Sequence, residues 1–273
     1  MGRDDTIRPM QAATPHTLTQ KNLEIRDNFD AIAKRYDLTN RVISCGVDRH
    51  WRRLAAGLLR DLPPGATVLD LACGTCDLAL ELLHQNAGLR VVGVDLSRAM
   101  LGLAAKKVAG ARGAGTAAGP AEGVGSAVSL VNAPAEALPF ADGCLNGAMI
   151  GFGIRNVPDF RAGLREMRRV LRPGGRIVVL EFSTPPSRLL WRLYNFYFFH
   201  LLPRIGGLIT GREQAYRYLT RSVADFPGAA EFARAMEEAG FASVTWRALQ
   251  GGIVCIHTGV RPFGSPGMNG SRP

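Results

Sequence analysis

The sequence has little cysteine, no long apolar run and no mark of a secreted protein. Its 273 residues include five cysteines, an odd number, so we expect a reducing compartment and no disulfide framework. No uninterrupted apolar stretch is long enough to span a bilayer, and charged residues at positions 3–5 argue against a secretory signal. We therefore expect a cytoplasmic protein without a transmembrane helix.

Patterns typical of metal sites are also scarce. Cys73 and Cys76 form a Cys-x-x-Cys pair, but no second cysteine or histidine pair follows at the spacing of a zinc site. A redox pair is an alternative interpretation of this spacing, although the turn that carries it has another explanation, given below. The sequence thus predicts no metal centre.

Acidic residues are fewer than basic ones. The chain has 33 Lys and Arg against 23 Asp and Glu, a formal net charge of +10. Such a field attracts phosphates, which indicates a membrane surface or a nucleic acid as partner. Because the basic residues are spread along the chain, a role in solubility alone fits equally well.

The composition favours one domain. A hydrophobic content of 47% is enough for a sizeable core, and no second compositional regime appears. We expect polar tails at 1–19 and 262–273 around a domain at 20–261. A Gly- and Ala-rich stretch at 110–125 predicts a flexible insertion within that domain, because it offers little side-chain surface to bury.

Strand-like and helix-like patterns alternate through the middle of the chain. Helical periodicities at 76–84, 97–108 and 160–171 separate short apolar runs at 67–71, 90–95, 127–133, 144–150 and 176–182. Ser97 is a candidate N-cap, and Arg-Pro-Gly-Gly at 172–175 predicts a turn. The alternation is typical of a parallel sheet with helices on both faces, and two last runs at 241–249 and 252–259 predict an antiparallel pair.

Two helices are expected before the first strand, at 20–36 and 48–62. They could cover the functional site as a lid or simply cover one face of the sheet, and the sequence leaves both open. A third helical segment, at 189–209, is the most aromatic part of the chain and carries interleaved basic residues. It fits either a membrane interface or a buried helix.

Polar and small residues follow the predicted parallel strands at the points where they end. They are the segment 70–75, Asp95, Pro134 with Ala135, the segment 151–156, and Glu181. Ligands of open parallel sheets bind beyond the carboxyl ends of the strands, so we expect these residues on one rim. Asp95 lies about twenty residues after the first turn, the spacing at which a carboxylate accepts hydrogen bonds from ribose hydroxyls.

The first turn argues against a dinucleotide. Gly74 is its one glycine, and Cys76 stands where a Gly-rich phosphate loop would have a second. Asp70 within the preceding strand further disfavours phosphate and favours a ligand with an amine. The strand, turn, strand-end acid and terminal hairpin together resemble class I S-adenosylmethionine-dependent methyltransferases, which implies a Rossmann-like, mixed seven-stranded sheet, mostly parallel with a C-terminal antiparallel hairpin.

Further motifs narrow this resemblance. The blocks are FDAIAKRYD (29–37), AEALPF (135–140), GFGIRNV (151–157), LRPGG (171–175), LEFS (180–183) and YRYL (216–219). They resemble the ubiquinone/menaquinone biosynthesis C-methyltransferase family and cover nearly the whole chain outside its tails. The GFGIRN and YRYL blocks are more specific than the cofactor turn.

The resemblance implies a set of cofactor-binding residues. Thr75 would contact the cofactor at the turn, Asp95 at the ribose and Ala135 at the adenine edge. The same implied set includes Asp70, Gly74, Pro134 and Gly151. Cys76 and Pro134 depart from the family pattern. Cys76 replaces the second glycine of the turn, and Pro134 stands where the family usually has Asp or Asn, so this position has neither an amide N–H nor a polar side chain for the adenine.

The implied reaction is transfer of a methyl group from S-adenosylmethionine to a ring carbon of a prenylated quinol. Arg155 and the adjacent Asn156 are the candidates for polarising the ring hydroxyl, and Tyr36 is the candidate for covering the sulfonium. The implied partners are the quinol and a membrane surface at the inner face of the cytoplasmic membrane, with no nucleic acid, in a homo-oligomer or a quinone-biosynthesis complex. Alternatives are a non-catalytic scaffold that binds cofactor or quinone and a methyltransferase for another small molecule. The sequence leaves the choice between menaquinone and ubiquinone precursors open.

Overall fold

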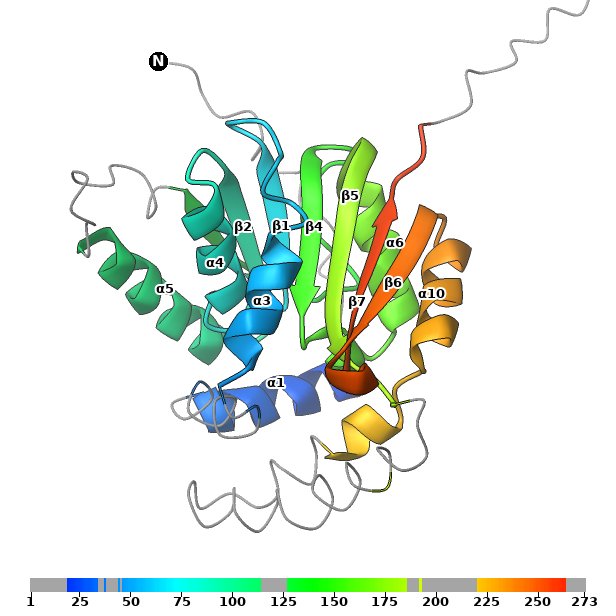
Figure 1. Cartoon of the computed structure of the whole chain (residues 1–273). Helices are drawn as coiled ribbons and strands as arrows, with labels where there is room; N and C mark the ends of the chain where they lie inside the picture. Colours follow the sequence, from blue (N-terminus) through cyan, green and yellow to red (C-terminus); the bar gives the residue numbers. More distant parts are fainter. Residues whose placement is uncertain are drawn as a thin grey trace, which may run out of the picture.

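A twisted sheet of seven strands runs through the centre of the protein (Figure 1). The structure is a computed structural model that describes residues 19–33, 37, 44, 46–113, 127–185, 192 and 220–263. The strand order is β3-β2-β1-β4-β5-β7-β6. This order reverses between β1 and β4, the kind of position at which open α/β sheets bind their ligands.

Five strands of the sheet are parallel, and the last two are antiparallel. The parallel strands are β1 (Thr67–Leu71), β2 (Arg90–Asp95), β3 (Val128–Asn132), β4 (Leu145–Gly151) and β5 (Leu171–Phe182). β7 (Val254–Val260) runs antiparallel between β5 and β6 (Ala242–Leu249). The predicted fold class, including the C-terminal hairpin, is therefore confirmed.

Helices cover both faces of the sheet. The hydrophobic cluster on one face draws on α3 (Asp48–Ala56), α4 (Asp77–Gln85) and α5 (Arg98–Gly113). The cluster on the other face draws on α6 (Phe160–Val170) and α10 (Ala229–Glu238). β1 is buried along its whole length and serves both cores, with Val68 on one side and Leu69 and Leu71 on the other. This two-sided burial explains why the strand is apolar apart from Thr67 and Asp70, both of which are buried.

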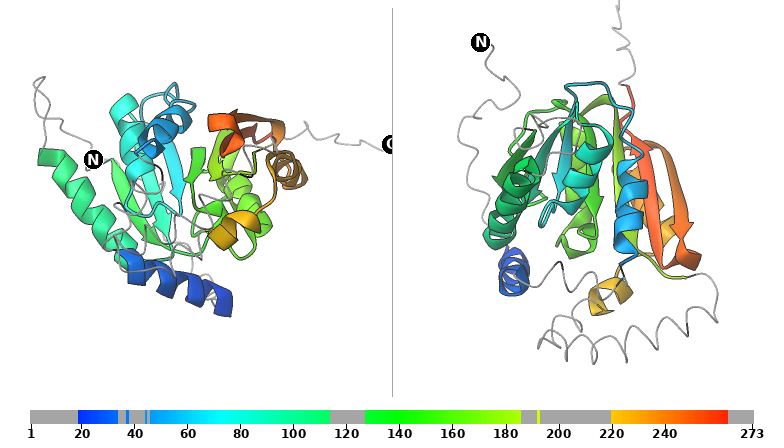
Figure 2. Two further views of the ribbon diagram at one scale, coloured as in Figure 1. Left: turned by 60° about the horizontal axis from the view of Figure 1, so that its bottom comes forward. Right: turned by 60° about the vertical axis from the view of Figure 1, so that its left-hand side comes forward.

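The carboxyl ends of β1 to β5 meet at one edge, and α1 (Gln20–Ile32) lies across that edge (Figures 1 and 2). α1 begins at the N-cap Thr19, whose side chain accepts a hydrogen bond from the Asn22 amide. Of the two alternatives for the N-terminal helices, α1 thus takes the position expected of a lid. α3 instead packs on α4 and the sheet.

Several boundaries differ from the expectation, three of them by five residues or more. α3 ends at Ala56, where Gly57 begins a series of turns, and not at Leu62. α5 continues to Gly113, into the stretch predicted as an insertion. The segment 172–175 is a bulge inside β5 and not a free turn: Leu145 pairs with Leu171 but Gly147 pairs with Arg176, and Gly174 takes the positive φ of 78°.

Several expectations fall outside the described residues. They are the tails before residue 19 and after 263, the rest of the Gly/Ala stretch at 114–126, and the aromatic segment 189–209 except Arg192. The domain boundaries and the position of the aromatic segment therefore stay predictions. Within the described part of the chain, no helix combines the length and apolarity needed to cross a membrane.

Candidate active site

The turn after β1, residues 72–76, is tightly wound. Ala72, Gly74 and Cys76 all have positive φ angles, of 50°, 54° and 66°. The turn is held to the neighbouring strand β2 by the Cys73 amide, which donates to the Val94 carbonyl at 3.0 Å. The backbone therefore reverses within a few residues and leads directly into α4.

Asp95 links this turn to the end of β2. Its Oδ2 accepts a hydrogen bond from the Gly74 amide at 2.8 Å, and its Oδ1 accepts one from the Ser97 amide at 2.8 Å. Burial raises the pKa of the Asp95 carboxyl, and the two amide donors oppose that rise. Each carboxylate oxygen retains a further acceptor position, so Asp95 is able to accept hydrogen bonds from the hydroxyls of a ribose.

Ser97 caps α5 as predicted, since its Oγ accepts a hydrogen bond from the Met100 amide at 3.0 Å. The same hydroxyl donates to Asp30 of α1. Ser97 thus joins the N-terminus of α5 to the helix that lies over the edge of the sheet.

Asp70 and Thr75 contact other helices. Asp70 is fully buried, and its Oδ2 accepts a hydrogen bond from the Ala79 amide of α4 at 3.1 Å. The Thr75 hydroxyl donates to Asp37 Oδ1 at 2.7 Å, while Lys107 Nζ of α5 lies 2.9 Å from Thr75 Oγ1. Both side chains therefore fix the turn between its flanking helices.

Lys107 completes a charged cluster around the turn. Its Nζ lies 2.6 Å from a carboxylate oxygen of Asp37 and 2.6 Å from one of Asp77. The cluster connects the segment after α1, the turn, α4 and α5. Tyr36, the residue proposed to cover the sulfonium, lies outside the described residues, but its neighbour Asp37 is held against the turn.

Cys76 has the left-handed conformation that favours glycine, with φ 66° and ψ 25°. Its thiol and that of Cys73 fit beside Gly93 of β2, where a Cβ would stand 3.0 Å from Cys73 Sγ and 3.3 Å from Cys76 Sγ. A hydrogen bond to Cys76, together with burial, raises the pKa of the Cys73 thiol. Both thiols are buried and free, an environment that disfavours reactivity.

The loop after β3 carries Pro134, Ala135 and Glu136. One oxygen of Glu136, Oε1, accepts a hydrogen bond from the Asp159 amide at 3.4 Å. The other, Oε2, is buried without a hydrogen-bond partner among the described residues. This loop lies beside the end of β2, because β3 pairs with β2 through Asn132 and Asp95.

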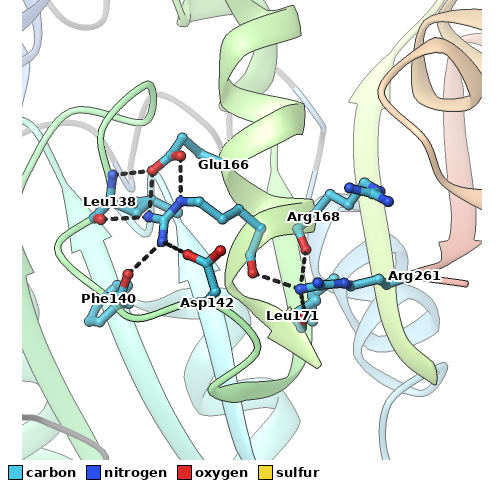
Figure 3. Close-up of polar contacts among 8 residues, drawn as sticks. Leu138, Phe140, Asp142, Glu166, Arg168, Leu171 and Arg261 are labelled. Carbon is cyan, nitrogen blue, oxygen red and sulfur yellow. Dashed lines mark hydrogen bonds and ion pairs between the residues drawn. The ribbon is translucent and has the colours of Figure 1, made fainter. Parts of the chain in front are cut away.

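A network of polar contacts joins the continuation of this loop to α6, and Leu138, Phe140, Asp142 and Glu166 are labelled in it (Figure 3). The side chain at its centre is that of Arg169. Its guanidinium donates to the carbonyls of Leu138 and Phe140 at 2.9 and 2.7 Å, and it pairs with Glu166 and Asp142 at 2.7 and 2.8 Å. Glu166 in turn accepts a hydrogen bond from the Leu138 amide at 2.7 Å. The chain that follows the adenine-side loop is thereby fixed to α6.

The loop after β4 packs directly on the first turn. A Cβ at Gly153 would stand 2.7 Å from the Ala72 Cβ, so this close approach requires glycine. Phe152 has a positive φ of 58°, an unusual conformation for an aromatic residue. The Gly151 Cα faces Leu78 of α4, where a Cβ would meet Leu78 Cδ2 at 3.1 Å.

Arg155 forms a buried ion pair with Glu181 at the end of β5. Its Nη1 lies 2.7 Å from Glu181 Oε1 and donates to the Phe152 carbonyl at 2.6 Å. The guanidinium also stacks over the Phe182 ring, 5.3 Å from its centroid. Burial raises the pKa of Glu181, against the influence of Arg155. Arg155 Nε is buried without a hydrogen-bond partner in the described part of the chain.

A cavity of about 640 Å³, its open mouth included, lies where these loops meet α1. Gly74, Asp95, Ala135 and Asn156 line it, so it brings together four of the predicted site residues. Asp70, Thr75, Pro134, Gly151 and Arg155 do not line it. Other residues that the sequence did not single out as site residues also line the cavity, although Phe152 lies within the predicted rim segment 151–156. They are Asn22, Ile25, Arg26 and Phe29 of α1, Ser97, Glu136 and Phe152.

The cavity fits a ligand with a ribose and an amine better than one with phosphates. Two carboxylates, those of Asp95 and Glu136, lie at its wall, and most of its other lining side chains are apolar. The one turn glycine has its amide already bonded to Asp95. The described residues contain no group of three or more acidic, histidine or cysteine side chains able to hold a metal ion.

The fold and this site define the class of the protein. A solved Thermotoga maritima structure, described as a SAM-dependent methyltransferase, matches with a TM-score of 0.59 and 19% sequence identity, over 87% of this chain and 99% of that one. With the strand order, this likeness shows the class I methyltransferase fold.

Sequence relatives give the family. The ubiE/COQ5 methyltransferase family matches residues 17–261. A Geobacter sulfurreducens protein named "Ubiquinone/menaquinone biosynthesis C-methyltransferase UbiE" is 47% identical over 247 residues, covering 90% of this chain and 91% of that protein. A "Demethylmenaquinone methyltransferase" of Mycobacterium marinum is 43% identical over 88% of this chain and 94% of its own. The chain belongs to the ubiE/COQ5 methyltransferase family and is an S-adenosylmethionine-dependent C-methyltransferase.

Proposed function

We propose that this enzyme methylates a ring carbon of a prenylated quinol precursor of menaquinone or ubiquinone, as in the conversion of demethylmenaquinol to menaquinol. The observation that carries this proposal is the 47% identity, over nine-tenths of the chain, to a relative named for that biosynthesis. The cavity supports it, because a single mostly apolar space is bounded by both the cofactor turn and the loop after β4.

S-Adenosylmethionine supplies an electrophilic methyl group on sulfur. Bound at the cavity, it would supply this methyl group to the quinol ring carbon, which would give up its proton in exchange. Holding the ring in line with the methyl group lowers the barrier by several kcal/mol at least, about 7 in favourable cases. The remaining task of the protein is to make the ring electron-rich by stabilising negative charge on its hydroxyl oxygen.

Arg155 suits this task through its charge and its place. It belongs to the short helix η3 (Ile154–Asn156) directly after the cavity residues Phe152 and Gly153. Glu181 and the Phe152 carbonyl occupy Nη1, and Arg155 does not itself line the cavity, so we propose that a water links one of its remaining N–H donors to the phenolate oxygen. Asn156 lines the cavity and is proposed to orient the substrate, and Tyr36 is proposed to cover the sulfonium.

The role of Arg155 is testable if the ion pair is removed as a unit. Arg155→Met alone would leave Glu181 buried without its cation, at a cost of about 3–5 kcal/mol. We therefore compare Glu181→Gln with Arg155→Met/Glu181→Gln, measuring transfer of the labelled methyl group to reduced quinone precursors. The double variant is expected to bind the cofactor as the single variant does and to turn over about 100-fold more slowly. Equal turnover of the two would contradict the role.

The same assay separates the proposed function from its alternatives. Methyl transfer to a demethylmenaquinol or to a ubiquinol precursor identifies the acceptor. A chain that binds the cofactor but methylates neither acts on another small molecule. Absence of binding in a calorimetric titration would instead favour a scaffold, the hypothesis that Cys76 and Pro134 motivate.

A prenylated acceptor lies in a membrane, so we propose that the enzyme works at the inner face of the cytoplasmic membrane as a peripheral protein. The net charge of +10 and the aromatic segment 189–209 support this proposal. Co-sedimentation with liposomes is expected to increase with anionic lipid and to fall when residues 188–209 are deleted. Binding that responds to neither change would contradict it. The proposed homo-oligomer is tested separately, by light scattering of the protein in solution without liposomes.

A further inference from the structure

The loop after β3 has one side chain able to accept a hydrogen bond from an adenine. Its five residues are Ala133, Pro134, Ala135, Glu136 and Ala137. Four of them have no polar side-chain atom, and Pro134 also has no amide hydrogen. Glu136 is therefore the sole side-chain candidate within this loop.

The position of the loop follows from that of the ribose. Asp95, at the end of β2, is the carboxylate placed for ribose hydroxyls, and β3 is paired directly beside β2. The purine attached to that ribose therefore lies toward the end of β3, where Ala133, Ala135 and Glu136 line the cavity. An adenine presents ring nitrogens that accept hydrogen bonds and one exocyclic amine that donates them.

The carboxylate of Glu136 has an oxygen that could accept a hydrogen bond from this amine. Its Oε1 is held by the Asp159 amide at 3.4 Å, which leaves Oε2 buried and without a hydrogen-bond partner among the described residues. An unpaired buried carboxylate oxygen is costly, and a donor on a ligand in the adjoining cavity would supply the missing partner. The side chain also belongs to a residue of the cavity wall.

We propose that Glu136 accepts a hydrogen bond from the 6-amino group of the adenine of S-adenosylmethionine and so selects adenine over purines that lack this amine. Ala135, beside it, offers its amide to a ring nitrogen. Glu136 takes the place of the polar side chain that Pro134 lacks. This assignment rests on the cofactor-binding part of the proposed function and is independent of the acceptor.

The test compares two ligands across three variants. Calorimetry gives the Kd of S-adenosylhomocysteine and of its analogue with hydrogen in place of the 6-amino group, for the wild type, Glu136→Gln and Glu136→Ala. A hydrogen bond to a charged acceptor predicts that the wild type prefers the amine-bearing ligand by about 10-fold or more. The ratio is expected to fall to about 1–2 in Glu136→Ala and to stay intermediate in Glu136→Gln, whose carbonyl still accepts.

Glu81→Ala is the matched control, because Glu81 lies on α4, away from the cavity, and contacts Gln85. Its ratio is expected to equal that of the wild type. A ratio that survives in Glu136→Ala, or that falls equally in Glu81→Ala, overturns the assignment. Thermal melts of each variant establish that it is folded. A wild type that binds neither ligand would overturn the proposed function itself, which is a distinguishable result.

Discussion

Asp70 shows how one buried carboxyl can serve the turn without touching the cavity. It accepts a hydrogen bond from the Ala79 amide in the first turn of α4, where helix amides have no intrahelical partner. Burial raises the pKa of this carboxyl to about 8, so the group is mostly protonated at neutral pH. A neutral Asp70 supports the start of α4 and leaves the ribose hydroxyls to Asp95.

This pKa makes the stability of the protein depend on pH. Folded Asp70 holds its proton up to about pH 8, whereas the unfolded chain releases it near the ordinary value of 3.8. The contribution of Asp70 protonation to the free energy of unfolding is therefore fully present below pH 3.8. It is lost as the pH rises toward 8, by up to about 1.4 kcal/mol per pH unit. Asp70→Asn keeps an acceptor for Ala79 and removes the titration, so it is expected to flatten this decline.

Urea unfolding at about pH 5, 6.5 and 8 measures the effect as a difference between the two free-energy profiles. Asp61→Asn is a suitable control, because the hydrogen bond to Arg176 lowers the pKa of Asp61. Asp61 is therefore ionised in both the folded and the unfolded state over this pH range, and its replacement is expected to leave the slope of the profile unchanged. Parallel profiles for the wild type and Asp70→Asn would show that Asp70 ionises normally in the folded protein.

Cys76 carries a conformational cost that glycine would avoid. Its φ of 66° costs an L-residue about 1 kcal/mol, but its buried thiol packs beside Gly93. Cys76→Ala keeps the cost and removes the sulfur, whereas Cys76→Gly removes both. The Gly variant is therefore expected to be more stable than the Ala variant by about 0.5–1 kcal/mol.

The comparison is read from urea midpoints of the two variants. Ala79→Gly provides the contrast, because position 79 lies inside α4, where glycine costs about 1 kcal/mol relative to alanine. An Ala variant at position 76 more stable than the Gly variant would mean that the left-handed conformation is not maintained.

Among the elements, α6 supports the cavity from a distance. Arg169 joins this helix to the carbonyls of Leu138 and Phe140, beyond the loop that carries Glu136 (Figure 3). Arg169→Met is expected to lower the free energy of unfolding by about 2–3 kcal/mol, because these hydrogen bonds involve a charge and lose their donor. Affinity for S-adenosylhomocysteine is expected to fall with it, as the loop loosens.

Arg165→Met is the matched control, because it removes a positive charge from α6 but leaves the contacts of Arg169 in place. Arg165 is exposed and lies 3.7 Å from Asp159, an arrangement worth less than about 0.5 kcal/mol. Calorimetry and denaturation of both variants give the comparison. Equal effects at positions 165 and 169 would indicate a general loss of charge on α6 and not a loss of loop support.

The elements also show what the sequence could and could not predict. Apolar runs indicate the strands, and parallel strands end at one edge, so the sequence alone predicts that Gly74, Asp95 and Ala135 lie near one another, and all three line the cavity. The partners of Thr75 were not predictable, because Lys107 and Asp37 lie 32 and 38 residues away along the chain. Tertiary packing alone brings them to the turn.

Glu136 was missed as a site residue, and the position of the predicted helix α1 was left open, for related reasons. A glutamate before Ala-Leu-Pro-Phe gives no local sign that one of its oxygens will be buried and unpaired. The periodicity of α1 predicted a helix with an apolar side, but the sequence could not say whether that side would meet a sheet face or the cavity. Phe29 and Ile25 in fact line the cavity.

At the scale of the whole molecule, α1 closes a cavity that the sheet and its loops leave open. It is joined to the N-terminus of α5 through Asp30, whose Oδ1 accepts hydrogen bonds from the Ser97 hydroxyl and, at 3.4 Å, from the Ala99 amide. Ser97 is also bonded to Asp95 through its amide. A ligand on Asp95 and the position of α1 are thereby connected through one residue.

Ligand binding is accordingly expected to protect α1 from hydrogen exchange. A ligand at about 100 times its Kd stabilises the folded state by about 2.7 kcal/mol, and amides 20–32 should share in that gain because their helix covers the cavity. Asp30→Ala is expected to abolish most of the protection of α1 while amides 72–76 remain protected, since the turn binds the ligand without α1. Asp27→Ala, on the same helix but paired with its neighbour Arg26, should leave both patterns unchanged. Mass spectrometry with and without S-adenosylhomocysteine resolves the two segments. Protection of α1 that persists in Asp30→Ala would show that direct contacts of Ile25 and Phe29 with the ligand, and not the link to Ser97, hold the helix closed.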